Sequence, residues 1–379
     1  MANNLGEKLS CSVDHPFDRA SQTVRVTNRC SYGQGRRTAR RGNQPSMVSE
    51  ELALRKQLRR AGISPDAIVA VWPEWWSEEA EGSISAITEL RYTVARRLGL
   101  SPQSMFDEEP RFIWRGEAKF KNLGAATEAE AVVLTSFSAA FGNILLAATP
   151  SSQQVDGSPT LTAAELREVL LGNFEIVTLD ALLTFVWSVG IPVVQMKLFP
   201  LRRKRMQATT VRVRERFAIL VGRESKFQAQ IAYVIAHEIG HLMLGHLQSV
   251  TALLEMSDPL KIESSDEEEQ AADRFALELL TGHPDIEVES NVSSFTAAQL
   301  ATAAIKESRQ SRVDPGQLAL CLGHATGRWR QAFGAQKLIP PGEQDIGAHL
   351  NALAEIQLNW DELSLENQDY VRLVLGFQI

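Results

Sequence analysis

The sequence predicts a mostly helical α+β protein, in which a small three-stranded sheet packs on one long helix. Apolar residues recur at spacings of three and four over much of the chain, as in helices that bury one face. Three short segments rich in β-branched residues, 191–199, 208–216 and 215–222, have the composition of strands. The apolar segment 228–246 follows them and has the length of a buried helix.

The composition is that of a globular protein from a reducing cellular compartment. The chain has 379 residues, of which 44% are hydrophobic, and a net charge of −7, so bulk attraction to nucleic acid or to an anionic membrane is disfavoured. Its three cysteines (Cys11, Cys30 and Cys321) are widely spaced and form no CxxC pair, which excludes a disulfide scaffold and a zinc ribbon. Residues 1–20 contain no apolar signal stretch. These features predict a cytoplasmic protein.

Changes in composition predict five regions. Residues 1–46 hold eight basic and three acidic residues without a sustained period, which predicts a disordered basic leader; the alternative is an arm that binds nucleic acid. Residues 47–148 are expected to form a helical domain, followed by a Ser- and Pro-containing linker at 149–160. Residues 161–289 hold the predicted strands and the metal motif. Residues 290–379 are expected to form a helical C-terminal region.

Helix starts are marked by local signals. Ser64 precedes Pro65, an N-cap followed by proline at the first helical position. Thr162 has Glu165 three residues later, which is the pattern of a capping box. Helices are therefore expected to begin at both places.

The short helices of residues 47–148 resemble helix-turn-helix domains of the Xre and lambda-repressor type, particularly in the stretch ARRLGLSPQSMF. The resemblance implies DNA binding, but residues 47–110 contain seven basic and eleven acidic residues. A DNA reader normally carries a clustered basic face. We therefore expect a packing or partner-recognition module, and direct DNA binding is disfavoured.

One segment, 131–155, carries no charged residue and must be tested as a membrane span. A spanning helix needs about 20 mainly apolar residues. Here Thr135, Ser136, Ser138 and Asn143 dilute the apolar run. A buried helix is the favoured interpretation, a membrane span is the alternative, and we expect no membrane partner.

The predicted long helix contains the H-E-x-x-H motif His237-Glu238-Ile239-Gly240-His241. At about 100° per residue, His241 lies about 40° and Glu238 about 100° around the helix from His237, so the three side chains share one side. Imidazoles one turn apart can both bind Zn²⁺, and Glu238 is then placed to act as the general base. The alternative is two ordinary histidines on a helix, but the flanking residues are apolar, and burying these groups without a partner is costly. The motif predicts one zinc ion per chain.

A third protein ligand must come from elsewhere. A metzincin would have a glycine and a third histidine where this chain has Leu244 and Leu247, so that class is excluded. His246 falls on the opposite side of a continued helix from His237. We therefore expect it to be a polar residue at the helix end, with a ligand role as the less favoured alternative.

The downstream segment Glu269-Gln270-Ala271-Ala272-Asp273 has an E-x-x-A-D signature similar to that of gluzincin-type peptidases, where the glutamate completes a His₂Glu site. The resemblance implies Glu269 as the third ligand, with Glu268 as the next candidate. Ala272 would allow close packing against the zinc helix, and Asp273 is a candidate to orient a ligand imidazole. The alternative is a solvated acidic run, 266–269, at a helix start. Both interpretations can hold if residues 266–268 face solvent and Glu269 points into the protein.

The ordered motifs together resemble the ImmA/IrrE-type zinc metallopeptidases. The matching segments, which span about 165–285, are GIPVVQMKLFP, FAILVG, IAHEIGHLMLGH and EQAADRFALELL. The family often has LLMP where this chain has LLTGHP, which places His283 near a substrate loop, although a role for it is disfavoured. The resemblance implies an intracellular peptidase that cuts a helix-turn-helix transcriptional repressor, in a stress response or in the regulation of mobile elements and defence.

Other functions stay open at this level. A non-catalytic regulatory or antitoxin-like module could use the peptidase fold to bind a protein, and a DNA-binding regulator could act through residues 47–110. Cys321 and His324 share a predicted helix at a three-residue spacing, but both fit a packed helix, so no metal or redox role is expected. The oligomeric state is left open.

Overall fold

The computed structural model describes most of the chain after residue 48. The described residues are 49–113, 118–121, 127–150, 161–202, 206–247, 252–255, 266–286, 288 and 294–377. The predicted leader, 1–46, and nearly all of the predicted linker, 149–160, lie outside them. Residues 48–379 cluster as one compact unit, so the predicted domains within this range stay a prediction.

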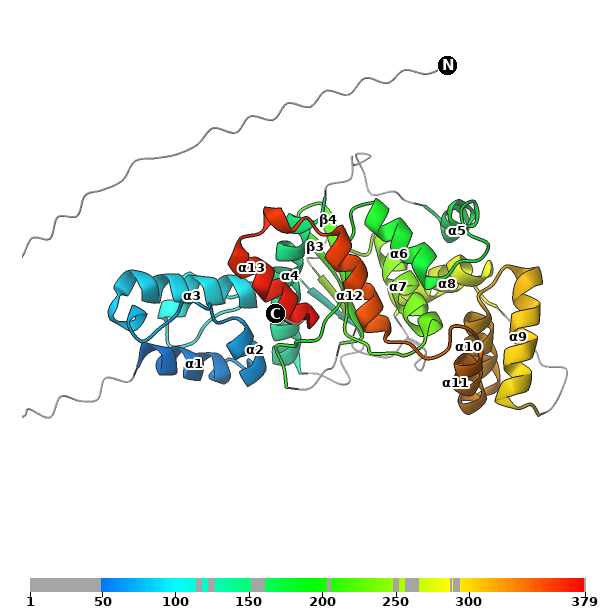
Figure 1. Ribbon diagram of the computed structural model, residues 1–379, viewed down its shortest axis with the longest axis horizontal. Helices are drawn as coiled ribbons and strands as arrows, with labels where there is room; N and C mark the ends of the chain where they lie inside the picture. The colour runs from blue at the N-terminus through cyan, green and yellow to red at the C-terminus, as the bar shows by residue number, and fades with distance from the viewer. Residues whose placement is uncertain are drawn as a thin grey trace, which may run out of the picture. The chain divides into compact units, whose positions relative to one another are not determined.

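The fold is α+β and mostly helical, as predicted (Figure 1). The α-helices are α1 (Glu50–Arg60), α2 (Pro65–Ala70), α3 (Ile84–Leu98), α4 (Glu128–Ala148), α5 (Ala163–Leu171), α6 (Leu179–Ser188), α7 (Gln228–Met243), α8 (Glu267–Thr281), α9 (Ala297–Ser311), α10 (Pro315–Thr326), α11 (Trp329–Leu338), α12 (Ile346–Gln357) and α13 (Leu365–Leu375). Short 3₁₀ turns are η1 (Ala80–Gly82), η2 (Gln103–Phe106) and η4 (Trp360–Glu362). The predicted caps are confirmed: Ser64 accepts the Ala67 N–H, and Thr162 and Glu165 form a complete capping box.

The sheet contains the three predicted strands and two more. The predicted ones are β2 (Val193–Gln195), β3 (Ala208–Val213) and β4 (Arg216–Val221). Two further strands, β1 (Ala118–Lys121) and β5 (Ala252–Glu255), extend the sheet to the order β1-β5-β3-β4-β2. Strand β3 is antiparallel to β4 and β5, whereas the outer pairs β1–β5 and β2–β4 are parallel.

Helices α4 and α7 cover opposite faces of strand β3. Gly142 of α4 lies so close to Val211 that a Cβ at this glycine would overlap the valine side chain. The preceding residue, Thr210, instead donates a hydrogen bond to Glu238 of α7. Successive residues of a strand point to opposite faces, so the two helices sandwich β3, and Thr209, Thr210 and Val211 are all fully buried.

Helix α4 is long and apolar enough to cross a membrane by length and composition alone. However, 78% of its most apolar 18-residue window is buried inside the structure. The helix contacts α3, α13 and strands β3, β4 and β5. These contacts make α4 a core helix of the described residues, as the sequence favoured.

The C-terminal helices divide between two apolar clusters. Helices α9, α10 and α11 pack on one another around a small core of their own. Their link to the rest includes the Gln317 side chain of α10, whose Nε2 donates to the Ala229 carbonyl of α7 at 2.5 Å. Helices α12 and α13 belong to the main core, where Tyr370, Val371 and Val374 are buried.

Asn351 of α12 closes the edge strand β2. Its Oδ1 accepts the Gln195 N–H at 2.8 Å, and its Nδ2 donates to the Gln195 and Leu375 carbonyls, both at 2.8 Å. The amide thus takes the place of a neighbouring strand, which satisfies buried edge groups that would otherwise pair with another chain.

We expect Asn351→Ala to lower the free energy of unfolding by about 1–3 kcal/mol or more, since it leaves the buried Gln195 N–H and two carbonyls without this partner. Chemical denaturation measures the change. The exposed Asn359, replaced by alanine, is the matched control. Equal stability of the two variants would show that the edge does not need the amide.

Candidate metal centre

Helix α7 places three polar side chains in the interior. The exposed fractions of His237, Glu238 and His241 are 1%, 0% and 0%. The rest of the helix is also almost entirely buried, because it packs against α8, α6, α10 and strand β3. The apolar residues around the motif therefore pull the three polar groups into the core, where each needs a partner.

A close contact between α7 and α8 brings in the fourth polar group. A Cβ added at Gly240 of α7 would lie 3.1 Å from the Ala272 carbonyl oxygen and 3.2 Å from the Ala272 Cα of α8. Only a glycine fits this approach without displacement. Helix α8 begins at Glu267 after the Asp266 N-cap, and the contact directs Glu269, 2% exposed, toward the histidines.

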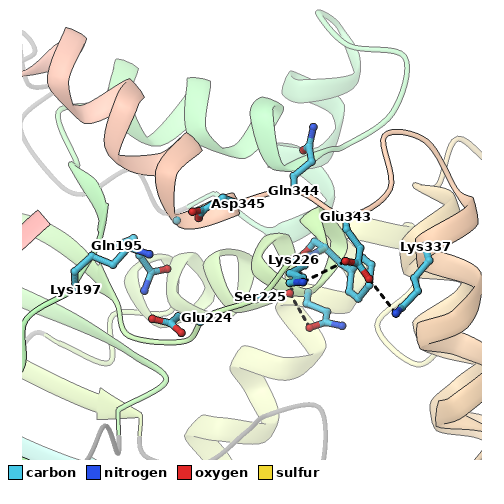
Figure 2. Close-up of a pocket in the computed structure, with 12 residues that line it drawn as sticks. Gln195, Lys197, Glu224, Ser225, Lys226, Lys337, Glu343, Gln344 and Asp345 are labelled. Atoms are coloured by element: carbon cyan, nitrogen blue, oxygen red, sulfur yellow. Dashed lines mark hydrogen bonds and ion pairs between the residues drawn. The ribbon is translucent and has the colours of Figure 1, made fainter. Parts of the chain in front are cut away.

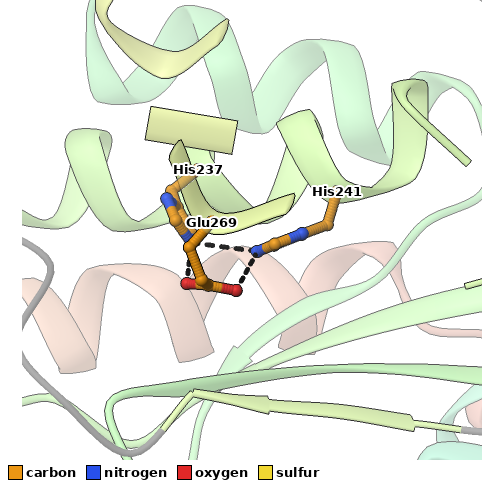
Figure 3. A group of neighbouring side chains, drawn as sticks. All are labelled: His237, His241 and Glu269. Carbon is orange, nitrogen blue, oxygen red and sulfur yellow. Dashed lines mark hydrogen bonds and ion pairs between the residues drawn. The ribbon is translucent and has the colours of Figure 1, made fainter. Parts of the chain in front are cut away.

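The side chains of His237, His241 and Glu269 converge as Figure 3 shows. The Nε2 atoms of the two histidines are 3.0 Å apart. Glu269 Oε2 lies 3.4 Å from His237 Nε2, and Glu269 Oε1 lies 3.3 Å from His241 Nε2. Donors at ~2.0–2.1 Å from one tetrahedral zinc are about 3.3 Å from each other. The three separations and the His₂Glu donor set therefore fit a zinc ion.

A carboxylate on α8 orients the first histidine. Asp273 Oδ1 lies 2.8 Å from His237 Nδ1, and the Tyr233 hydroxyl donates to the same oxygen at 3.0 Å. With the Nδ1 proton held by Asp273, the lone pair of His237 Nε2 faces Glu269 and His241. This is the arrangement expected of a metal-binding imidazole and its supporting carboxylate.

Glu238 keeps one carboxylate oxygen without a partner. Thr210 Oγ1 donates to Oε2, whereas the buried Oε1 has no hydrogen-bond partner among the described residues. An unpaired buried carboxylate oxygen is costly unless it meets a polar group such as a water or a substrate. The orphaned oxygen next to the His₂Glu cluster thus also fits a site that takes a metal and its ligands.

Burial and neighbouring charges shift the pKa values of the four groups in different directions. Burial alone would lower the pKa of His237, but the carboxylates of Asp273 and Glu269 raise it to about 10. Burial lowers the pKa of His241 to about 4. Burial raises the pKa of Glu238 to about 7, whereas for Glu269 the two histidines outweigh burial and lower the pKa. The carboxylates of Asp273 and Glu269 on either side of His237 thus favour positive charge at this place.

Comparison with known proteins bears on the same helices. A family model described as Peptidase U49 matches residues 212–317, a range that contains α7 and α8. The match supports a peptidase function. It is broadly compatible with the resemblance to ImmA/IrrE-type peptidases. No curated protein and no solved structure matches the chain.

Other candidates from the sequence lie apart from this cluster. Among the described residues, the group of converging ligand atoms comprises His237, His241 and Glu269, and it includes neither Glu268 nor His283. His283 is exposed beyond the end of α8. The Cys321 thiol has its pKa raised to about 12 by burial, as expected of an inert packed cysteine.

A helix continued past Met243 would place His246 on the side of α7 opposite to His237, but the structure places it against His241. The helix ends at Met243, and Gly245 has a φ of +75°, so the chain turns back at this point. His246 Nδ1 lies 2.7 Å from His241 Nδ1. The prediction was wrong about its direction because the helix ends before His246.

Sequence reasoning missed Thr210 and Tyr233. Tyr233 is four residues before His237, so it shares a helix face with the motif, and this spacing was a signal for a contact near Asp273. Thr210 comes from a different element, and only the pairing of α7 with β3 brings it to Glu238.

A large cavity lies away from the metal centre. It has a volume of about 870 Å³ and is lined by residues from the start of α7, the end of β2 and the loop before α12, including Gln195, Lys226 and Glu343 (Figure 2). None of its lining residues belongs to the His237 cluster. Size alone therefore does not identify the peptidase site.

If the cluster binds zinc, as its geometry fits, we expect Gly240→Ala to weaken that binding several-fold. The new Cβ would force α8 away by a few tenths of an ångström and displace Glu269. Overpacking a core destabilises the folded protein by about 1–3 kcal/mol. This loss is as large as, or larger than, the ~1 kcal/mol of helix stability that alanine gains over glycine. Competition with a chelator measures the affinity. Gly82→Ala, which has open space around its Cβ, is the control, and equal affinities would contradict the packing argument.

If the cluster binds zinc, replacing Asp273 with asparagine is expected to weaken that binding about 10–100-fold, because it removes the charge that holds the His237 tautomer. The exposed Asp361→Asn is the control for loss of one acidic group. Zinc titration of both purified variants gives the comparison. Wild-type affinity in Asp273→Asn would remove Asp273 from the site.

Proposed function

We propose that this protein is a zinc-dependent endopeptidase that hydrolyses a peptide bond in a specific protein substrate. The observation that carries the proposal is the convergence of His237, His241 and Glu269 beside a glutamate with an unpaired buried oxygen. The match to a peptidase family over these same helices also supports it. One zinc ion per chain, held by the three converging side chains, is part of the proposal.

Bound zinc would act as a Lewis acid that polarises the scissile carbonyl and lowers the pKa of a water molecule. Glu238 supplies the proton transfers. Its Oε1 takes a proton from the attacking water as the water oxygen bonds to the carbonyl carbon. The same carboxyl then gives this proton to the amide nitrogen as the C–N bond breaks, so the base is regenerated.

The environment of Glu238 suits this role. Burial raises the pKa of Glu238 to about 7. A general base is most effective when its pKa lies near the pH at which the enzyme works. The Thr210 hydrogen bond holds Oε2 and leaves Oε1 to act. His237 and Glu269 are in turn fixed by Asp273 and by the α7–α8 contact, so the reacting groups are preorganised.

The proposed substrate is a helix-turn-helix transcriptional repressor in the cytoplasm, cut in a stress response or in mobile-element or defence regulation. The support is the resemblance of the motif order to ImmA/IrrE-type peptidases, together with the helix-turn-helix-like segment of residues 47–110. The acidic balance of that segment favours recognition of a protein over direct contact with DNA.

Zinc analysis followed by co-expression tests the proposal. The purified full chain is expected to contain one zinc per chain, and co-expression with repressors encoded beside its gene is expected to shorten one of them. Mass spectrometry of the fragments identifies the cut bond. Absence of zinc would refute the site, whereas stoichiometric zinc without any cleavage would favour a non-catalytic binding module.

We expect Glu238→Gln to retain zinc but to lower the cleavage rate about 10²–10⁴-fold, because the amide cannot take a proton from water. The same substitution at the exposed Glu307 of α9 is the control. The rate is measured on a gel, by following over time the disappearance of the full-length repressor that the co-expression identifies. Cleavage by Glu238→Gln at the wild-type rate would exclude Glu238 as the base.

A further inference from the structure

His246 contacts the metal-site histidine that Asp273 does not reach. Its Nδ1 lies 2.7 Å from His241 Nδ1, and the two ring centroids are 5.0 Å apart with the planes inclined by 61°. This geometry is that of an in-plane hydrogen bond between two imidazole nitrogens. One of the two atoms must carry the proton and the other must accept it.

The cation proposed at His241 Nε2 decides which nitrogen donates. His241 Nε2 faces Glu269 Oε1 and His237 Nε2, so this nitrogen must offer its lone pair if it binds a cation. His241 then carries its proton on Nδ1 and donates it to His246 Nδ1. His246 accepts with Nδ1 and carries its own proton on Nε2.

The backbone holds His246 in this position. Gly245 has a φ of +75°, a conformation that glycine adopts without strain, and it reverses the chain after α7. The His246 N–H then donates to the His241 carbonyl at 3.0 Å. Leu247 is 1% exposed, and its carbonyl accepts from Arg212 Nη1 of β3 at 3.4 Å. The residue is thus fixed on both sides.

We propose that His246 is a positioning residue that holds His241 in its metal-binding tautomer, as Asp273 does for His237; this rests on the proposed zinc site. His246 is not itself a ligand, because it contacts the Nδ1 side of the His241 ring, opposite to the nitrogen that faces Glu269. The two ligand imidazoles therefore have different supports: His237 has a carboxylate, and His241 has a neutral imidazole.

The prediction concerns metal affinity and the spectrum of the metal. Loss of such an outer partner typically costs about 10–100-fold in metal affinity. His246→Ala removes the acceptor. His246→Asn restores one, because the Asn Oδ1 is as many bonds from Cβ as the His Nδ1 and can accept the His241 proton.

The experiment compares the full-length wild-type chain, both His246 variants and the control His324→Ala, which alters an exposed histidine on α10. Zinc affinity is measured by competition with a chromophoric chelator, the visible spectrum after loading with Co²⁺ reports coordination, and the melting temperature of the metal-free protein reports folding. We expect about 10–100-fold weaker binding in His246→Ala and near wild-type binding in His246→Asn and His324→Ala. The Co²⁺ spectrum is expected to keep its wild-type form.

Wild-type affinity in His246→Ala would overturn the inference, and so would equally weak binding in both His246 variants at an unchanged melting temperature. A Co²⁺ spectrum that shows the loss of a nitrogen ligand in both variants would make His246 a ligand and would also overturn it. Each of these results leaves the zinc site intact in the wild type. Absence of zinc binding in the wild-type chain would instead refute the proposed function itself.

Discussion

The contact between Gly240 and Ala272 is the constraint on which the candidate metal centre depends. The two histidines and the proposed base lie on one helix, but the proposed third ligand comes from α8, and its carboxylate reaches them because the two helix backbones nearly touch. A side chain at position 240 would occupy the space that the α8 backbone fills. The glycine within the H-E-x-x-H motif thus serves packing, while its neighbours serve chemistry.

Because these polar groups are buried, a cation between them would stabilise the cluster. A carboxylate and two imidazoles in the core lose their hydration, and their mutual contacts restore only part of it. The carboxylates of Glu269 and Asp273 raise the pKa of His237 to about 10, which shows that they favour positive charge between them. A divalent ion would deliver such charge to the same place and let both histidines bind as neutral ligands. The same burial that makes the cluster costly therefore favours metal uptake.

Local signals in the sequence predicted much of the fold and of the site, and contacts between distant elements account for the rest. The capping box of Thr162 and the spacing of His237 and His241 follow from patterns within a few residues, whereas Glu269 was expected from the resemblance of its segment to gluzincin-type peptidases. Strands β1 and β5 were not predicted, because their pairing joins segments far apart in the chain. The direction of His246 was missed because a helical projection holds only while the helix continues, and Gly245 ends it. Thr210 was missed because the β3–α7 contact is tertiary.

Strand β3 links the apolar core to the base of the proposed reaction. Val211 packs beneath α4 at Gly142, and the neighbouring Thr210 points to the other face and holds Glu238. A shift of one residue in register that brought Val211 to Glu238 would also send Arg212 into the apolar contact with α4. Both errors are costly, since the first leaves a carboxylate oxygen unpaired and the second buries a polar group. The packing of α4 against the sheet therefore also fixes Thr210 as the residue of β3 that faces Glu238.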